Sequence, residues 1–264
     1  MLNLIKYEFT RKYKSIFMIL ITVFALNLFL ISSGPGGSML FLVFSPIVLG
    51  LLYLVDIIKM YASDLNKKTA YMIFMTTNSG YKIIISKLLT AVLEGFGFLL
   101  IYFLFFIMNG IYIILSFGEV VVFSRLISAI NDIFSRNLGY NFNLVYLFLF
   151  LLAALVFLIA FITTVYTAIT IRKSLFSEVK FGGLLSFIIF LFINWIITNL
   201  SSWFFDSLRN VAPYYESMNI LASTGRITPE TLTIIFLPMI VVSIIQIIIL
   251  TGFSGYLLEN KINL

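Results

Sequence analysis

The stretch LLTAVLEGFGFLLIYFLFFIMNGIYIILSF occupies residues 88–117 and contains a single charged side chain, that of Glu94. A helix needs about 20 mostly apolar residues to cross the roughly 30 Å hydrocarbon core of a bilayer. This run is longer than that, so it predicts a membrane-spanning helix that tilts or protrudes. Outward from it, five further apolar runs reach spanning length: residues 16–32, 39–58, 142–171, 183–205 and 232–257.

The composition also indicates a bilayer environment. The 264 residues are 61% hydrophobic and 11% charged, whereas a soluble domain is about half apolar and about a quarter charged. The chain has no Cys and no His, which excludes thiolate nucleophiles, disulfides and histidine acid–base catalysis. We therefore predict an all-α integral membrane protein with six transmembrane helices in one domain, residues 1–264, with no catalytic residues, metal site or cofactor of its own.

Basic side chains lie mostly on one side of the predicted spans. Of the 17 Lys and Arg residues, the other side holds only Arg125, Arg136, Arg209 and Arg226. Because loops rich in Lys and Arg stay in the cytoplasm, we expect both termini to be cytoplasmic in a multi-pass protein of the plasma membrane. The net charge of +6 follows this distribution, so we expect contact with membrane lipids and no nucleic-acid partner.

The N-terminal segment, residues 1–15, has helical periodicity. Leu2, Ile5, Phe9 and Tyr13 share one face, and most of the basic residues lie elsewhere. A helix of this kind lies at a membrane surface, so the segment predicts an interfacial elbow helix. The alternative is a plain cytoplasmic flank that follows the charge rule.

The loop between spans two and three, residues 59–87, is longer than the few residues that join adjacent helices. It contains the apolar segment Tyr-Met-Ile-Phe-Met at residues 71–75. An exposed apolar group of this kind usually marks a docking site. The loop therefore predicts a partner-binding helix on the cytoplasmic side, and the alternative is a loop folded against its own bundle.

The order of residues in this loop resembles the cytoplasmic signature of ABC-2-type transporter permeases: Asp64, Lys68, residues 71–75, Thr76, Ser79 and the Ile-Ser-Lys-Leu start of span three. The elbow and the six spans resemble the family too. So does the external loop, residues 206–231, whose Val-Ala-Pro-Tyr-Tyr segment is similar to short helices that re-enter the outer leaflet. Asp64 stands where the family pattern often has Glu.

The resemblance implies the membrane-spanning subunit of an ABC exporter with a cytoplasmic coupling helix. The residues implied in ATPase coupling are Asp64, Lys67, Lys68, Tyr71, Met72, Phe74 and Met75. Implied partners are an ABC ATPase subunit and a second permease, either another copy or a homologue. The chain has no G-x-x-x-x-G-K-[ST] motif, so ATP and Mg are expected on the partner subunit.

Polar side chains inside the spans predict a translocation path along Glu94, Thr163, Thr167, Asn194 and Thr198. The Thr pair and the Asn–Thr pair each have the i, i+4 spacing of one helix face. The alternative is helix–helix hydrogen bonding, at about 0.6 kcal/mol each. Near the cytoplasmic ends, Asp56 (one turn before Lys59) and Glu94 are expected either to pair across helices, to line an opening, or to snorkel.

Thin polar stripes in Phe-rich spans favour a hydrophobic or amphipathic substrate, such as a peptide, an antimicrobial compound or a lipid-like molecule. Two other classes of protein compete with the exporter. A secondary transporter predicts an inverted repeat and mid-span acidic residues, neither of which is visible in the sequence. An ATP-independent membrane scaffold or accessory protein predicts that no ATPase is needed.

Overall fold

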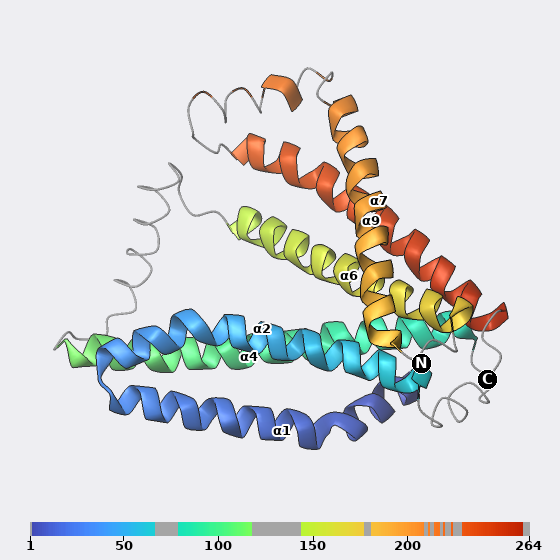
Figure 1. Ribbon diagram of the computed structural model, residues 1–264. Helices are drawn as coiled ribbons and strands as arrows, with labels where there is room; N and C mark the ends of the chain where they lie inside the picture. The colour runs from blue at the N-terminus through green and yellow to red at the C-terminus, as the bar shows by residue number, and fades with distance from the viewer. Residues whose placement is uncertain are drawn as a thin grey trace. The chain divides into compact units, whose positions relative to one another are not determined.

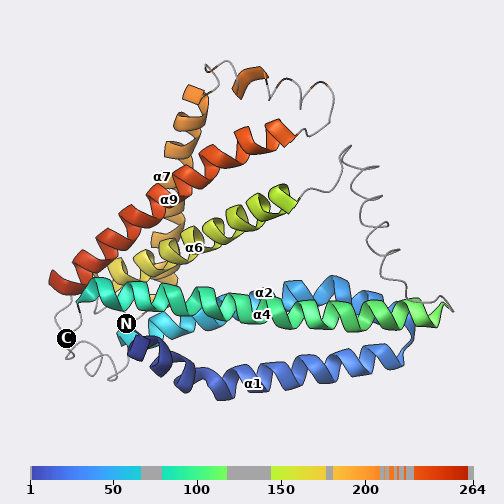
Figure 2. The ribbon, with the colours of Figure 1, turned by 180° about the vertical axis from the view of Figure 1, so that it is seen from behind.

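The computed structural model describes residues 2–66, 79–117, 144–176, 181–208 and 229–260, together with residues 211, 214–216, 219 and 223. The described parts are helical and contain no strand. By internal contacts the chain divides into two compact units, Met1–Val122 and Phe123–Leu264. Each unit contains three of the long helices drawn in Figures 1 and 2.

The described part of the chain contains six long helices. The first unit holds α1 (Leu2–Ser32), α2 (Pro35–Asn66) and α4 (Gly80–Ser116). The second unit holds α6 (Leu144–Leu175), α7 (Gly182–Leu208) and α9 (Pro229–Asn260). All six contain a segment long and apolar enough to cross a membrane. The prediction of an all-α, multi-pass membrane protein with six candidate spans is confirmed.

The helices extend beyond the apolar runs that predicted them. The second run ends at residue 58, but α2 continues to Asn66; the third begins at residue 88, but α4 starts at Gly80. The Ser79 hydroxyl caps α4 by accepting a hydrogen bond from the Lys82 N–H. Helical turns therefore enter the predicted loop 59–87 from both sides. With 37 residues, α4 is about 55 Å long, so it exceeds the hydrocarbon core.

The N-terminal segment and the first span form one continuous helix, α1. Near its N-terminal end α1 bends toward α2 and α4, as both views show (Figures 1 and 2). Ion pairs from Glu8, Arg11 and Lys12 to those two helices accompany the bend. The interfacial position of residues 1–15 stays a prediction.

A tight turn joins α1 to α2. Gly34 has φ 93°, a left-handed conformation that glycine adopts without strain. The Ser33 N–H donates to the Leu30 carbonyl at 3.1 Å. The first turn of α2 then passes so close to α1 that a Cβ atom on Gly37 would lie 2.1 Å from the Leu30 oxygen. The hairpin between the first two helices therefore requires glycine at position 37.

We expect Gly37→Ala to lower the free energy of unfolding by about 1–3 kcal/mol, because backbone atoms on both sides of the contact must move. Gly36→Ala is the matched control, since a Cβ atom there meets nothing within 4 Å. SDS titration in mixed micelles, followed by circular dichroism, measures both. Equal stability of the two variants would show that the hairpin is not this tight.

In the second unit, α6 packs against α9 and α7. Small buried residues of α6, among them Ala153, Ala160 and Ala168, permit close approach of a neighbouring helix. Phe161 of α6 and Phe190 of α7 pack edge to face, with ring centroids 5.6 Å apart. No residue of α7 is buried, so α7 is the most exposed helix of its unit.

Candidate functional site

In the first unit, α1, α2 and α4 bring seven charged side chains together near the ends of the helices that the distribution of Lys and Arg predicts to be cytoplasmic. They are Glu8, Arg11, Lys12, Asp56, Asp64, Lys87 and Glu94. We call this group the charge network. A charge removed from water is costly unless it is paired and hydrogen-bonded. Which charges pair therefore decides how the three helices are held.

One half of the network is electrically balanced. The Lys87 ammonium bonds to Glu8 Oε1 at 2.6 Å and to Asp64 Oδ2. The Arg11 guanidinium bonds to Asp64 Oδ1 at 2.5 Å and to Glu8 Oε2 at 2.7 Å. The side chains of Glu8, Asp64 and Lys87 are at most 5% exposed. Two cations and two anions thus form a closed ring that joins all three helices.

The other half has two carboxylates for one ammonium group. The Lys12 ammonium bonds to Glu94 Oε2 at 2.9 Å and to Asp56 Oδ2. Lys12 and Glu94 are buried, and Asp56 is 18% exposed. Among the described residues Glu94 Oε1 has no hydrogen-bond partner. One cation therefore serves two carboxylates, and one carboxylate oxygen remains unsatisfied.

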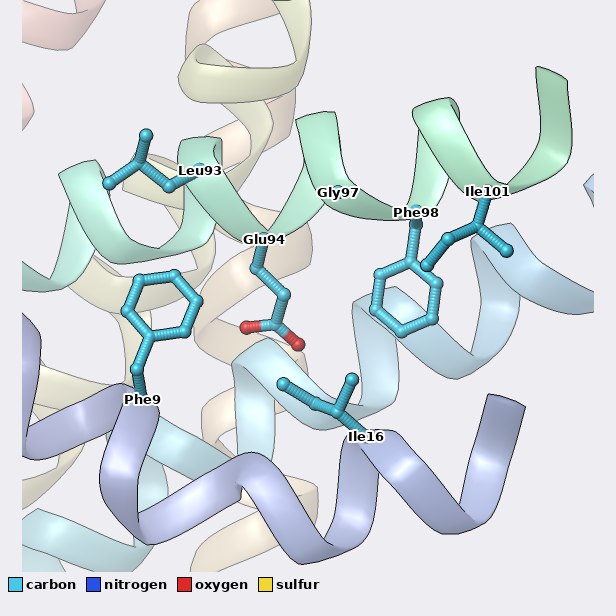
Figure 3. Close-up of a pocket in the computed structure, with 7 residues that line it drawn as sticks. All are labelled: Phe9, Ile16, Leu93, Glu94, Gly97, Phe98 and Ile101. Carbon is cyan, nitrogen blue, oxygen red and sulfur yellow. The ribbon is translucent and has the colours of Figure 1, made fainter. Parts of the chain in front are cut away.

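Glu94 also lines a pocket of about 100 Å³ between α1 and α4. Phe9 and Ile16 of α1 line it from one side, and Leu93, Gly97, Phe98 and Ile101 of α4 line it from the other. Figure 3 shows the Glu94 carboxylate pointing from α4 toward α1, with the rings of Phe9 and Phe98 on either side of it. The pocket is apolar apart from this one carboxylate.

The local sequence explains why these charges meet. Glu8 and Lys12 are four residues apart, and Lys87 and Glu94 are seven apart, so each pair lies on one helix face. When the three helices pack together, Glu8, Arg11 and Asp64 gather around Lys87, and Asp56 and Glu94 gather around Lys12. The sequence indicates cross-helix pairing of Asp56 and Glu94 as one possibility, but it does not identify their partner Lys12 or the ring around Lys87, although charges repeated at helical spacing were a visible signal.

The structure specifies two expectations that the sequence leaves open. Most basic residues of the segment 1–15 are expected to lie away from its apolar face, but Lys12 is 6% exposed and bonds to Glu94 of α4. Asp56 and Glu94 are expected either to pair across helices, to line an opening or to snorkel, and in the structure both bond to Lys12 of α1.

A second polar contact joins the same helices toward their opposite ends. The Asn109 amide of α4 donates to Asn27 Oδ1 of α1 at 2.9 Å. The Ser38 hydroxyl of α2 donates to Asn109 Oδ1. All three side chains are 0% exposed. The first unit is therefore connected by charges near one end and by amide and hydroxyl groups near the other.

Of the residues predicted to couple to an ATPase, the structure describes only Asp64. Asp64 is 2% exposed, and its carboxylate contacts Arg11 and Lys87. The other predicted coupling residues lie outside the described part of the chain: Lys67, Lys68, Tyr71, Met72, Phe74 and Met75.

The five predicted path residues divide between the two units, with Glu94 in the first. In the second unit Thr163 and Thr167 are buried, and the Ser254 hydroxyl of α9 donates to Thr167 Oγ1 at 2.8 Å. This contact is the interhelical hydrogen bonding that was the alternative reading for these threonines. Asn194 and Thr198 are exposed on α7, where the Thr198 hydroxyl donates to the Asn194 carbonyl at 2.9 Å.

The network can hold the three helices in register and present one carboxylate oxygen, Glu94 Oε1, that has no hydrogen-bond partner among the described residues. In the described ranges no group of three or more acidic side chains is placed to hold a metal ion. Most of the external loop 206–231, where re-entrant helices were predicted, is outside these ranges. A scan against protein-family models and searches of the curated proteins and of the solved structures find no match to this chain.

Proposed function

We propose that this chain is the membrane-spanning subunit of an ATP-driven ABC exporter and works with a separate ATPase subunit that binds ATP and Mg. One observation carries the proposal: the two helix ends that flank residues 67–78 are tied to each other. Lys87 of α4 bonds to Asp64 of α2, and the same ammonium bonds to Glu8 of α1. A partner that moves residues 67–78 would therefore move three helix ends together.

The reason is mechanical. If α2 and α4 ended without mutual contacts, a force on the segment between them would be absorbed by the segment itself. Chains of packed or hydrogen-bonded groups can carry energetic coupling between distant sites. The balanced ring of Glu8, Arg11, Asp64 and Lys87 is such a chain, and it joins the helices whose ends flank the segment in the sequence. It supports a coupling role for residues 67–78.

The apolar residues of that segment suit docking on the ATPase. Burying a side chain such as Phe74 or Met72 in a partner's groove contributes about 1.5–3 kcal/mol. Lys67 and Lys68 would orient the contact, since rim charges affect specificity more than affinity. The distribution of Lys and Arg supports placing this segment and both termini in the cytoplasm of a cell whose plasma membrane holds the protein.

The second unit supports the presence of a second permease, either another copy or a homologue. Asn194 and Thr198 lie exposed on α7 among large apolar side chains such as Leu191 and Trp195. Polar side chains in hydrocarbon favour helix–helix contacts in which they find partners. A neighbouring permease subunit that packs on α7 would bury them beside the pathway, and the apolar helices suit a hydrophobic or amphipathic substrate.

The double variant Phe74→Ala with Met72→Ala tests the proposal. We expect the variant to insert normally, because both residues lie between the candidate spans, and to lose its ATPase because the docking contacts are gone. The tagged chain is purified from its native membranes, and mass spectrometry measures the amount of Walker-motif ATPase that accompanies it. The matched control is Phe103→Ala with Met108→Ala, which removes the same side chains from exposed positions of α4.

Retention of the ATPase by the first variant would show that residues 67–78 are not the coupling element. Loss from both variants would point to general destabilisation. If the unmodified chain purifies without any Walker-motif ATPase, the exporter proposal fails and the ATP-independent scaffold becomes the better explanation.

A further inference from the structure

We infer that the pocket between α1 and α4 binds the ammonium group of a single-chain amphiphilic cation. The pocket combines apolar walls with Glu94, whose side chain is 2% exposed and whose Oε1 atom lacks a hydrogen-bond partner among the described residues. A buried carboxylate oxygen with no partner is rare and costly. A cationic donor from outside the chain would satisfy it.

The charge balance favours a cation over a neutral ligand. Lys12 is shared between Asp56 and Glu94, so this half of the network has two carboxylates and one ammonium. When both carboxylates are ionised, one added ammonium makes it neutral. The hydrogen bond that such a group donates to Glu94 Oε1 is charge-assisted, which is the stronger kind.

The aromatic walls favour the same ligand. The rings of Phe9 and Phe98 lie on either side of the Glu94 carboxylate (Figure 3). Aromatic faces attract ammonium groups through the ring quadrupole, and the attraction grows where water is excluded. A hydroxyl head group carries no charge and is attracted to ring faces less than an ammonium, and an anionic head group would be repelled by the Glu94 carboxylate.

The size of the pocket determines how much of the ligand it can enclose. At about 30 Å³ for each water-sized group, the volume of about 100 Å³ holds an ammonium nitrogen and its first carbons. Leu93, Gly97 and Leu100 then continue along α4 at helical spacing, and both leucines are at least half exposed. A hydrocarbon chain leaving the pocket can lie along this apolar strip.

Gly97 provides a way to fill the pocket without disturbing its walls. It lines the pocket, and a Cβ atom on it would meet nothing within 4 Å. Gly97→Leu therefore occupies the space that the ligand would take. Gly110→Leu is the matched control, because Gly110 lies farther along the same helix and is equally open.

The experiment measures saturable binding of radiolabelled decylammonium to the whole chain in nanodiscs, with empty nanodiscs subtracted. We expect unlabelled decylammonium to compete and decanol and decyl sulfate, with the same chain length, not to compete. Glu94→Gln should weaken binding at least about tenfold, because a charge-assisted bond is lost. Gly97→Leu should abolish saturable binding, and Gly110→Leu should leave it unchanged.

Several results would overturn the inference. Equal competition by decanol would show a site for hydrocarbon alone, and unchanged affinity in Glu94→Gln would remove the carboxylate from recognition. If no probe binds saturably, or if Gly110→Leu also abolishes binding, the pocket is not a cation site. Should Gly97→Leu not accumulate, Glu94→Gln carries the test, since it leaves Lys12 and Asp56 as a balanced pair. No ATPase is present, so the outcome does not bear on the proposed function.

Discussion

Replacing Lys87 with methionine is expected to lower the free energy of unfolding by about 3–5 kcal/mol, the cost of breaking a buried ion pair from one side. Lys87 is 2% exposed and bonds to both Glu8 and Asp64. Without its ammonium, Arg11 must serve two buried carboxylates. SDS titration in mixed micelles, followed by circular dichroism, measures the loss.

The matched control is Lys82→Met, since Lys82 lies on the same helix with an exposed side chain. Its stability should stay within about 0.5 kcal/mol of the unmodified protein. Adding Glu8→Gln to Lys87→Met leaves Arg11 and Asp64 as a balanced pair, so it should restore part of the lost stability. A Lys87→Met variant as stable as Lys82→Met would refute the closed ring.

Lys12→Met is expected to cost a similar amount, about 3–5 kcal/mol, because it leaves Asp56 and Glu94 without their shared cation. The compensating change here is Glu94→Gln, which removes the more deeply buried of the two carboxylates. The same SDS titration measures the single and double variants. Comparing Lys12→Met with Lys87→Met separates the contribution of the Lys12 half of the network to stability from that of the Lys87 half.

Rescue should be specific to each half. Glu94→Gln should recover stability in Lys12→Met but not in Lys87→Met, and Glu8→Gln should do the opposite. Interaction free energies of about 0.5–3 kcal/mol are typical of residues in direct contact, so the cycles can resolve this difference. If either neutral substitution rescues both lysine variants equally, the network responds to total charge and not to the pairs that the structure shows.

The two halves have different consequences for function. The Lys87 half is balanced and joins the helices that flank residues 67–78 in the sequence, so its role in the proposed exporter is to tie three helix ends together. In the Lys12 half two carboxylates share one ammonium, and Glu94 lines the α1–α4 pocket, so it can accept a cationic ligand. A ligand bound there would contact the same α1 and α4 that the balanced ring joins. Ligand binding and movement of residues 67–78 would then act on shared helices.

Sequence alone determined the helices, because the signal for a membrane span is local. An apolar run such as residues 88–117 must satisfy its backbone hydrogen bonds internally if it enters hydrocarbon, and a helix does this within the segment itself. The ends of the helices were less predictable. The predicted apolar runs stop at residue 58 and resume at residue 88, whereas α2 and α4 continue past these points. The Asp64–Lys87 pair and buried apolar side chains such as Tyr61 and Ile84 hold these extra turns together.

Only the tertiary structure decided which charges pair. Lys12 lies 44 residues from Asp56 and 82 residues from Glu94, and Lys87 lies 79 residues from Glu8. Such pairs depend on how each helix is rotated about its axis and how far it slides along its neighbours. Neither quantity is set by local composition, so a single lysine such as Lys12 fits a surface face or a buried pair equally well until the three helices are packed together.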